Sequence, residues 1–375
     1  MAKRGAGEGS IYKRGDGRWV GAFMLPDGLR KSLYARTRGE VSTRLREAQQ
    51  KAADGLPVAA GRTTIAAFLR WWLENRAAPT VRPRTLEAYT SIVEQHLIPA
   101  LGKARLSALT PDSIVAFMNR QTAKGLSARS VQFHHAVLRR ALGDAERMGY
   151  VARNVARLAS APRVERHEIS PMTAEQARTF LGATLKHPLH TLFVLAMSSG
   201  ARQGELLALS WQDVDFTTET IAIRATLHRR SGAFQREVPK TKTSRRTLAL
   251  APQAVASLHA LRAKQNEARL RASSLWEQQD WQPVFTDDRG RPLAGYNVTK
   301  AFQAALKVCG LPRQRFHDTR HGVATYMLSE GVPLKVIQTV LGHSTISVTA
   351  NTYSHVMPDL ERDAVQRVAG VLWAG

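Results

Sequence analysis

Two stretches of the sequence are poorly suited to regular structure, and they divide the chain into three parts. Residues 55–61 read Gly-Leu-Pro-Val-Ala-Ala-Gly, and residues 159–170 are rich in charge and carry Pro162. Glycine widens the freedom of the backbone and proline removes a hydrogen-bond donor, so both stretches are typical of linkers. The 375 residues also exceed what one hydrophobic core usually spans. We therefore expect two or three domains.

The part before the first linker predicts a small antiparallel sheet followed by a helix over 41–53. Three β-prone runs, IYKR, RWVGAF and RKSLYA, are separated by Gly-Asp-Gly at 15–17 and Pro-Asp-Gly at 26–28, which favour turns. Residues 1–50 hold eleven Lys/Arg against five Asp/Glu. Such a basic side is either merely solvated or binds DNA, and the charge of the whole chain favours DNA.

The middle part, residues 62–160, predicts a compact helical domain. Apolar residues stand at i, i+3, i+4, i+7 and i+8 counted from Ile65, and this spacing marks one buried helical face. Three more helices are indicated by their apolar spacing and their capping residues. Their markers are the run from Leu86 to Leu97, the pair Thr110-Pro111, and Ser127.

The last part, from residue 170 onwards, predicts a mixed α and β domain. Thr173 and Gln176 have the spacing of a capping box, which begins a helix. The remaining pattern predicts an apolar helix over 189–197 and several further helices over 252–373. Between them, two strand-like runs, 221–223 and 247–250, flank a basic hairpin.

The balance of charge narrows the class of partner. The chain has 54 Lys+Arg against 30 Asp+Glu, a formal net charge of +24. Nucleic acid, an anionic membrane or an acidic protein would each fit, but the sequence shows no basic amphipathic helix, no lipidation signal and no apolar run of about 18 residues. We therefore expect a soluble chain that binds nucleic acid. With a single cysteine, Cys309, and no secretory signal, a reducing intracellular setting is expected.

Four segments of the last part concentrate side chains that suit chemistry on phosphates. In the first, residues 198–211, an apolar helix stops at Gly200 and a new one begins beside Arg202. An arginine at such a turn can hold paired phosphate oxygens with its planar fork. The alternative is a surface ion pair between Arg202 and Glu205, which would contribute little.

The second segment is the basic hairpin from Arg224 to Arg246, which has eight Lys/Arg and only Glu237 opposing them. A solvated loop is the common explanation for such a run. A lysine on a hairpin can also deliver a proton to a leaving oxygen, and we expect this role for Lys240, with Lys242 as the rival.

The third segment, RFHDTRHGVATYML, places His317 and Arg320 three apart on one helical face. The same residues approximate the two-histidine helix of zinc hydrolases, with Asp318 in the usual place of glutamate. No third ligand follows at suitable spacing, and Arg320 between the ligands would repel a dication. His134 and His135 in the helical domain likewise lack partners at zinc-like spacing and are expected to be core or boundary residues.

The fourth segment, LGHSTISVTANTYSHV, contains His343 and Tyr353. A lone tyrosine is usually a half-buried packing residue. Beside two arginines, a lysine and two histidines in one basic domain, Tyr353 is instead expected to act as a nucleophile.

Together these side chains suffice for phosphoryl transfer without a metal. Arg202 and Arg320 would hold the non-bridging oxygens, and His317 would take the proton of the tyrosine hydroxyl, which is a poor nucleophile at its ordinary pKa near 10. Lys240 would protonate the departing 5′ oxygen, and His343 would donate a hydrogen bond to a non-bridging oxygen. The sequence shows neither carboxylates at metal-ligand spacing nor a GxxxxGK[ST] loop, so we expect neither metal, ATP nor another cofactor.

These motifs resemble the tyrosine recombinases, specifically phage-type integrases. The family pattern is G-x-R-x-x-E, a lysine in a basic hairpin, H-x-x-R, L-G-H and T-Y-x-H. It is matched by Gly200 to Glu205, Lys240, His317 to Arg320, Leu341 to His343, and Thr352 to His355. The resemblance therefore implies the catalytic set Arg202, Lys240, His317, Arg320, His343 and Tyr353, of which Lys240 is the one carried over on variable spacing.

The resemblance covers nearly the whole chain and implies a multidomain fold, mainly α with small β-sheets. Residues 1–58 would be an arm-type DNA-binding domain, a three-stranded sheet plus a helix. Residues 62–160 would be a four-helix core-binding domain of the SAM-like type, and residues 170–375 a mixed α+β catalytic domain.

The implied function is site-specific recombination that joins a phage genome or another mobile element to a bacterial chromosome through a 3′-phosphotyrosyl intermediate. The implied partners are double-stranded attachment sites, a homotetramer on DNA, a host DNA-bending protein and an excision factor, in the cytoplasm and without a membrane. The helix expected over 359–373 docks either on its own domain or on a neighbouring protomer.

Two alternatives use the same residues differently. A type IB topoisomerase would share the chemistry, but the arm-like N-terminus argues against it. A DNA-binding regulator could use residues 332–347 as a helix-turn-helix, but it would leave Arg202 and the basic hairpin unexplained.

Overall fold

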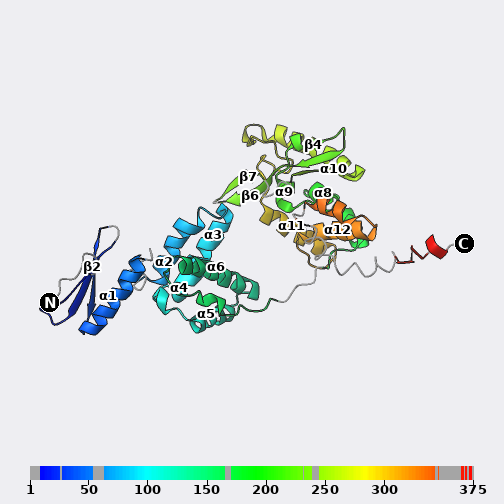
Figure 1. Cartoon of the computed structure of the whole chain (residues 1–375). Helices are drawn as coiled ribbons and strands as arrows, with labels where there is room; N and C mark the ends of the chain where they lie inside the picture. Colours follow the sequence, from blue (N-terminus) through cyan, green and yellow to red (C-terminus); the bar gives the residue numbers. More distant parts are fainter. Residues whose placement is uncertain are drawn as a thin grey trace. The chain divides into compact units, whose positions relative to one another are not determined.

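The computed structural model describes residues 9–25, 28–53, 63–164, 170–230, 232–238, 245–342 and 345, and near the end 365–366, 368–369 and 371–373. The chain divides into two compact units, Met1–Arg166 and His167–Gly375 (Figure 1). No helix of the described part has the length and apolar character that a membrane crossing needs.

The first unit begins with the predicted antiparallel sheet. Its strands are β1 (Ser10–Lys13), β2 (Trp19–Met24) and β3 (Arg30–Ala35), in the order β1-β2-β3. Helix α1 (Arg38–Ala53) packs on this sheet and buries Leu45 and Ala48 against Phe23. The helix begins before the predicted residue 41, because Thr37 Oγ1 accepts a hydrogen bond from the backbone N–H of Glu40 at 3.2 Å.

The rest of the first unit is helical, as predicted. Its elements are α2 (Ile65–Trp72) with a π-helical continuation (Leu73–Ala77), α3 (Pro83–Ile92) with another (Val93–Leu97), α4 (Ile98–Leu101), α5 (Pro111–Ala123) and α6 (Ala128–Arg147), with short 3₁₀ turns at Leu106–Ala108 and Val155–Arg157. The side chains of Thr64, Thr110 and Ser127 each accept a hydrogen bond at a helix start, so the local capping signals are used as the sequence suggests.

One polar contact fixes the packing of this helical body. The indole Nε1 of Trp72, a fully buried side chain, donates a hydrogen bond to Asp144 Oδ2 at 2.7 Å. Asp144 is also paired with Arg147, and Arg76 lies 3.8 Å from it. A buried carboxylate is costly without such partners, so the contact specifies how α2 meets α6.

The second unit is mixed, again as predicted. Its helices are α7 (Ala174–Ala183), α8 (His190–Ser199), α9 (Gln203–Leu207), α10 (Pro252–Ala272), α11 (Gly295–Val308), α12 (Asp318–Ser329) and α13 (Leu334–Leu341), with 3₁₀ turns at Trp211–Asp213 and Ser273–Leu275. The strands β4 (Val214–Asp215), β5 (Thr220–Ile223) and β8 (Arg246–Ala249) form one sheet in the order β4-β5-β8. The strands β6 (Thr226–Arg230) and β7 (Ala233–Glu237) form a separate hairpin.

Helix α8 is the centre of this unit. It packs against both α10 and α12, and six of its successive residues, Thr191 to Ala196, are buried. Phe193 of α8 packs on Phe180 and Phe302 at ring distances of 5.3 Å and 5.8 Å. Because α8 is held from several sides, the segment that follows its last turn has a fixed position, and Arg202 lies in that segment.

Residues 359–373 are described only in part. The described residues from 365 to 373 are helical, and Val365, Val368, Leu372 and Trp373 are exposed. Leu360 lies outside the described residues, so docking on the same or on a neighbouring protomer stays a prediction.

Candidate active site

A left-handed glycine turns the chain from α8 into the segment that holds Arg202. Gly200 has φ +63°, a conformation that side chains disfavour. A Cβ at this position would also lie 2.8 Å from Leu341 Cδ2, at the end of α13. Glycine is therefore required for both the turn and the close approach of α13.

Arg202 is oriented by Glu205, three residues further along. The guanidinium Nη1 of Arg202 lies 2.7 Å from Glu205 Oε1, and its backbone N–H donates to Glu205 Oε2 at 2.9 Å. Its Nη2 donates to the carbonyl oxygen of Gly342 at 3.2 Å. The Arg202 side chain is 37% exposed, whereas that of Glu205 is 4% exposed. The pair is thus anchored in the interior and leaves part of the guanidinium open to solvent, unlike the surface ion pair considered from the sequence.

Glu205 holds a second arginine, Arg246, at the start of β8. Arg246 Nη2 lies 3.0 Å from Glu205 Oε2, and Arg246 Nε donates to the carbonyl oxygen of Val340 at 2.6 Å. Burial by itself would raise the pKa of Glu205, but the charge and hydrogen bond of Arg246, followed by those of Arg202, outweigh it and lower the pKa. Glu205 is therefore an ionised carboxylate between two arginines.

Arg320 approaches the same turn from α12. Its side chain is among the largest that are fully buried, at 1% exposure, and its Nη1 donates to the carbonyl oxygen of Gly200 at 2.8 Å. A buried guanidinium is costly unless its donors are used, so this contact indicates a positioned cation. Arg202 and Arg320 thus both bind carbonyls where the Gly200 turn meets the end of α13.

His317 lies at the N-cap position of α12, directly before the helix that carries Arg320. Partial desolvation lowers the pKa of His317, and the positive charges of Arg320 and Arg202 lower it further. The neutral ring that results at neutral pH can accept a proton. The structure therefore brings Arg202, His317 and Arg320 into one electrostatic neighbourhood.

The residues that suggest a zinc helix have other contacts in the structure. Arg315 binds Asp318 Oδ1 through Nη2 at 2.9 Å. The rings of His317 and His321 lie 5.2 Å apart, and burial followed by the charge of His317 lowers the pKa of His321 to about 4. Asp318 is thus already engaged as the partner of an arginine.

Four of the predicted site residues, Lys240, Lys242, His343 and Tyr353, lie outside the described residues. Their roles stay predictions. Gly342, which directly precedes His343, is described and ends α13 in a left-handed conformation, with φ +66°.

The sequence analysis missed the role of Arg246, which it grouped with the solvated hairpin. Its side chain is 5% exposed. The burial of Arg246 could have been predicted from the alternation of side chains along the strand β8. Arg246 is two residues from the buried Leu248 and so lies on the same face of the strand.

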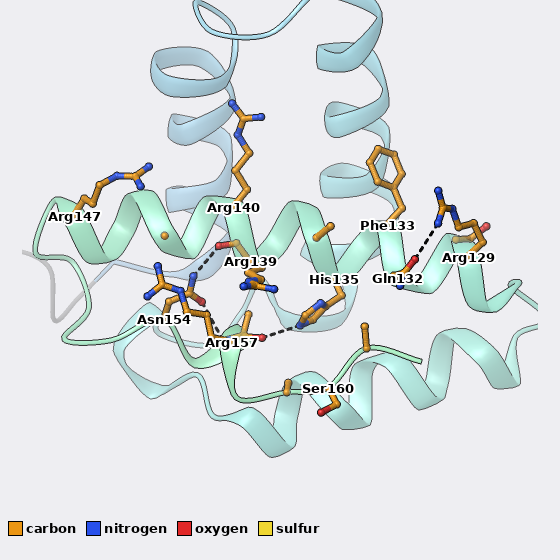
Figure 2. Close-up of a pocket in the computed structure, with 16 residues that line it drawn as sticks. Arg129, Gln132, Phe133, His135, Arg139, Arg140, Arg147, Asn154, Arg157 and Ser160 are labelled. Carbon is orange, nitrogen blue, oxygen red and sulfur yellow. Dashed lines mark hydrogen bonds between the residues drawn. The ribbon is translucent and has the colours of Figure 1, made fainter. Parts of the chain in front are cut away.

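A second candidate surface runs along α6 in the first unit. A groove of about 1230 Å³ lies between α6 and the segment 154–161. Figure 2 shows the side chains that line it. Five arginines line it, namely Arg129, Arg139, Arg140, Arg147 and Arg157. This concentration of guanidinium groups in a hollow suits a phosphate backbone.

Two hydrogen bonds, one of them buried, hold the segment 154–161 against α6. The His135 ring donates from Nε2 to the carbonyl oxygen of Ala156 at 2.8 Å, and Asn154 Nδ2 donates to the carbonyl oxygen of Arg139 at 2.8 Å. His135 and His134 are both buried, as the sequence predicts. The groove is therefore built by the fold of the helical body.

The chain is similar to known proteins in both sequence and structure. The pattern of the phage integrase family matches residues 165–359, and that of the phage integrase N-terminal SAM-like domain matches residues 64–121. The chain is 32% identical over 388 residues to an integrase of Streptomyces ambofaciens, with 97% of each chain covered. It is 28% identical over 355 residues to a XerC-like tyrosine recombinase of Caldanaerobacter subterraneus, covering 90% of this chain and 91% of the relative.

Two solved structures illustrate the similarity in fold. The Tn1549 transposon integrase in complex with transposon right end DNA superimposes with a TM-score of 0.70 at 20% identity, covering 82% of this chain and 100% of that one. The lambda integrase tetramer bound to a Holliday junction gives a TM-score of 0.56 at 21% identity, covering 89% and 95%. At this identity the likeness concerns the fold.

Proposed function

Because this chain belongs to the phage integrase family, we propose that it is a site-specific DNA recombinase that breaks and rejoins strands with Tyr353 as its nucleophile. It would integrate a phage genome or another mobile element, and its substrates would be double-stranded attachment sites.

The observation that carries the proposal is that two arginines are held beside the turn at Gly200. Arg320 binds the carbonyl of Gly200, and Arg202 binds the carbonyl of Gly342. Both cations are therefore held before any substrate arrives. A pentacovalent phosphate gathers negative charge on its non-bridging oxygens, and donors fixed in advance stabilise that charge most effectively.

The proposed step is a transesterification. The hydroxyl oxygen of Tyr353 attacks the phosphorus, the bond from phosphorus to the 5′ oxygen breaks, and a 3′-phosphotyrosyl ester forms. The tyrosine proton passes to His317, because burial and then the positive charges of Arg320 and Arg202 lower the pKa of His317 and leave its ring neutral at neutral pH. Lys240 gives a proton to the departing 5′ oxygen, with Lys242 as the rival, and His343 donates a hydrogen bond to a non-bridging oxygen. Since one phosphate ester replaces another, a 5′ hydroxyl can reverse the step, and these side chains require no metal or cofactor for it.

The arginine-lined groove along α6 is the proposed contact of the helical body with the DNA backbone (Figure 2). The net charge of +24 provides a general attraction to the same partner. We assign arm binding to residues 1–58, core binding to 62–160 and catalysis to 170–375. The active assembly would be a homotetramer on DNA in the bacterial cytoplasm, with host bending and excision proteins as further partners.

The test is covalent trapping of the tyrosyl ester. The substrate is a nicked duplex that spans the junction between the integrated element and the chromosome. After cleavage, the short fragment that carries the 5′ hydroxyl dissociates, so that religation cannot occur. We expect a protein–DNA adduct on denaturing electrophoresis with the full chain in EDTA, and no adduct with Tyr353→Phe.

An adduct that persists in Tyr353→Phe would contradict the assignment of the nucleophile, and loss of the adduct in EDTA would contradict the metal-free step. Exchange between two duplexes, measured against relaxation of a single plasmid, separates a recombinase from a type IB topoisomerase. A chain that only relaxes the plasmid is not the recombinase proposed.

A further inference from the structure

Arg246 occupies a position that the chemistry above does not use. It joins three segments, because it is the first residue of β8, its Nη2 binds Glu205 Oε2 at 3.0 Å, and its Nε donates to Val340 O at 2.6 Å. Glu205 in turn holds Arg202, and Val340 lies in the last turn of α13, just before Gly342 and His343. Arg246 therefore links the segment of Arg202 to the turn that leads into His343.

The exposure of the two arginines separates their roles. The Arg246 side chain is 5% exposed, and its Nη2 and Nε are already bound to the carboxylate of Glu205 and the carbonyl oxygen of Val340. The Arg202 side chain is 37% exposed. The cation that can reach a phosphate and the cation that holds the shared carboxylate are different residues.

We propose that Arg246 is a positioning residue for strand cleavage, which sets the place of Arg202 by fastening Glu205 to the end of α13 at Val340. This inference rests on the function proposed above. Without Arg246, Glu205 would keep one partner instead of two, and the Arg202 guanidinium would lose the fixed carboxylate that aims it.

Lysine cannot reproduce this arrangement. The planar guanidinium directs Nη2 and Nε to two acceptors at once, whereas an ammonium is a compact charge on a flexible stem. Arg246→Lys keeps the positive charge beside Glu205 and removes the simultaneous bond to Val340. It is therefore a milder variant than a neutral replacement, which would leave the buried carboxylate short of one cation.

The experiment compares two substrates. One is the nicked junction duplex, and the other is the same duplex with a methylphosphonate at the scissile position, where a neutral methyl replaces a charged non-bridging oxygen. A variant that misplaces Arg202 should be slow on the phosphodiester, where charge must be neutralised, and much less affected on the methylphosphonate. We expect Arg246→Lys to slow strand scission by about 10- to 100-fold on the first substrate and by less than about threefold on the second.

A matched control exists in the same unit. Arg236 also joins a buried carboxylate and a backbone carbonyl, since its Nη2 lies 2.9 Å from Asp213 Oδ2 and its Nε 3.0 Å from Ala208 O. Arg236→Lys removes an equivalent fork, one that binds Asp213 and Ala208 instead of Glu205 and Val340. We expect it to leave the ratio of the two scission rates at the wild-type value. Both rates come from one preparation, so the ratio is independent of the fraction of folded protein.

A double-mutant cycle gives the second readout. If Arg246 acts through Arg202, then Arg246→Lys should cause no further loss of phosphodiester scission in an Arg202→Ala background. An independent, multiplied loss would overturn the inference, as would equal slowing on both substrates. Failure of the wild-type chain to form the Tyr353 adduct would instead refute the proposed function, so the two failures are distinguishable.

Discussion

Arg320 donates a hydrogen bond from Nη1 to the carbonyl oxygen of Gly200, over 2.8 Å. A fully buried guanidinium of α12 is thereby fastened to the turn that positions Arg202. The turn has a left-handed glycine and packs against Leu341. The turn at Gly200 therefore positions Arg202 through the chain and Arg320 through a hydrogen bond.

We expect Gly200→Ala to impair both stability and cleavage. An alanine at φ +63° is strained, and its Cβ would lie 2.8 Å from Leu341 Cδ2, so α13 would have to shift. Strain and overpacking of this kind cost about 2 to 5 kcal/mol together. Thermal unfolding would show a lower Tm, and the adduct assay a slower scission.

The control for this change is Gly182→Ala in α7. No atom lies within 4 Å of a Cβ built there, and the position is helical, so alanine should be neutral or stabilising by roughly 0.5–1 kcal/mol. If both variants unfolded at the same temperature, the close approach of α13 to Gly200 would not be a constraint on this fold.

The sequence predicts those features that depend on local patterns. Thr110 and Ser127 begin α5 and α6 where their capping chemistry predicts, and the strand-like run at 221–223 lies within β5. These elements could be found because neighbouring residues decide them.

The sequence does not predict features that depend on distant partners. Glu205 looks like a surface partner of Arg202, yet tertiary packing buries it and supplies Arg246 from 41 positions further along. The contact of Arg320 with Gly200 spans 120 positions. Periodicity places a side chain on a face of its element, but it does not identify what that face meets.

The choice between Lys240 and Lys242 can be decided by changing the leaving group. A duplex with sulfur in place of the bridging 5′ oxygen releases a thiolate, which needs no proton. General acid catalysis contributes about 10²- to 10⁴-fold, so Lys240→Ala should lose that much on the oxygen substrate and regain most of it on the sulfur substrate. Lys242→Ala serves as the matched variant and should be near wild type on both.

If the sulfur substrate restored the scission rate of Lys242→Ala alone, Lys242 would be the general acid. If sulfur restored neither variant, a hairpin lysine would not be the proton donor. Scission rates under single-turnover conditions report on this step directly, because religation is prevented by loss of the short fragment.

Acid should destabilise the helical body through His134. Burial, followed by the charge of His96, lowers the pKa of His134 from 6.5 to about 4, and the two rings lie 4.3 Å apart. The unfolded chain therefore binds this proton below about pH 6.5, whereas the folded chain binds it only below about 4. The stability that a neutral His134 provides is present above pH 6.5 and is lost as the pH falls towards 4.

His134→Phe should remove this part of the pH dependence. His134 Nδ1 has no hydrogen-bond partner within the described part of the chain, so an apolar ring leaves no new group unsatisfied on that side. We would plot the free energy of unfolding, measured with denaturant, against pH from 8 to 4 for the wild-type chain and for His134→Phe. The two curves should be parallel above about pH 6.5 and should converge, or cross, below it. Curves that stay parallel throughout would mean that His134 does not contribute to acid unfolding.

The arginine groove along α6 should govern salt dependence more than sequence preference. Arg139 lines the groove and is exposed. If it contacts one phosphate, Arg139→Gln should weaken binding to specific and nonspecific duplexes alike and reduce the slope of log K against log salt by about 1. Arg70→Gln is the matched control, because Arg70 is already bound to Glu94 through two contacts of 2.9 Å. Equal slopes for Arg139→Gln and the wild-type chain in a fluorescence-anisotropy titration would exclude this groove as a backbone contact, whereas a loss confined to one sequence would make Arg139 a reader of bases.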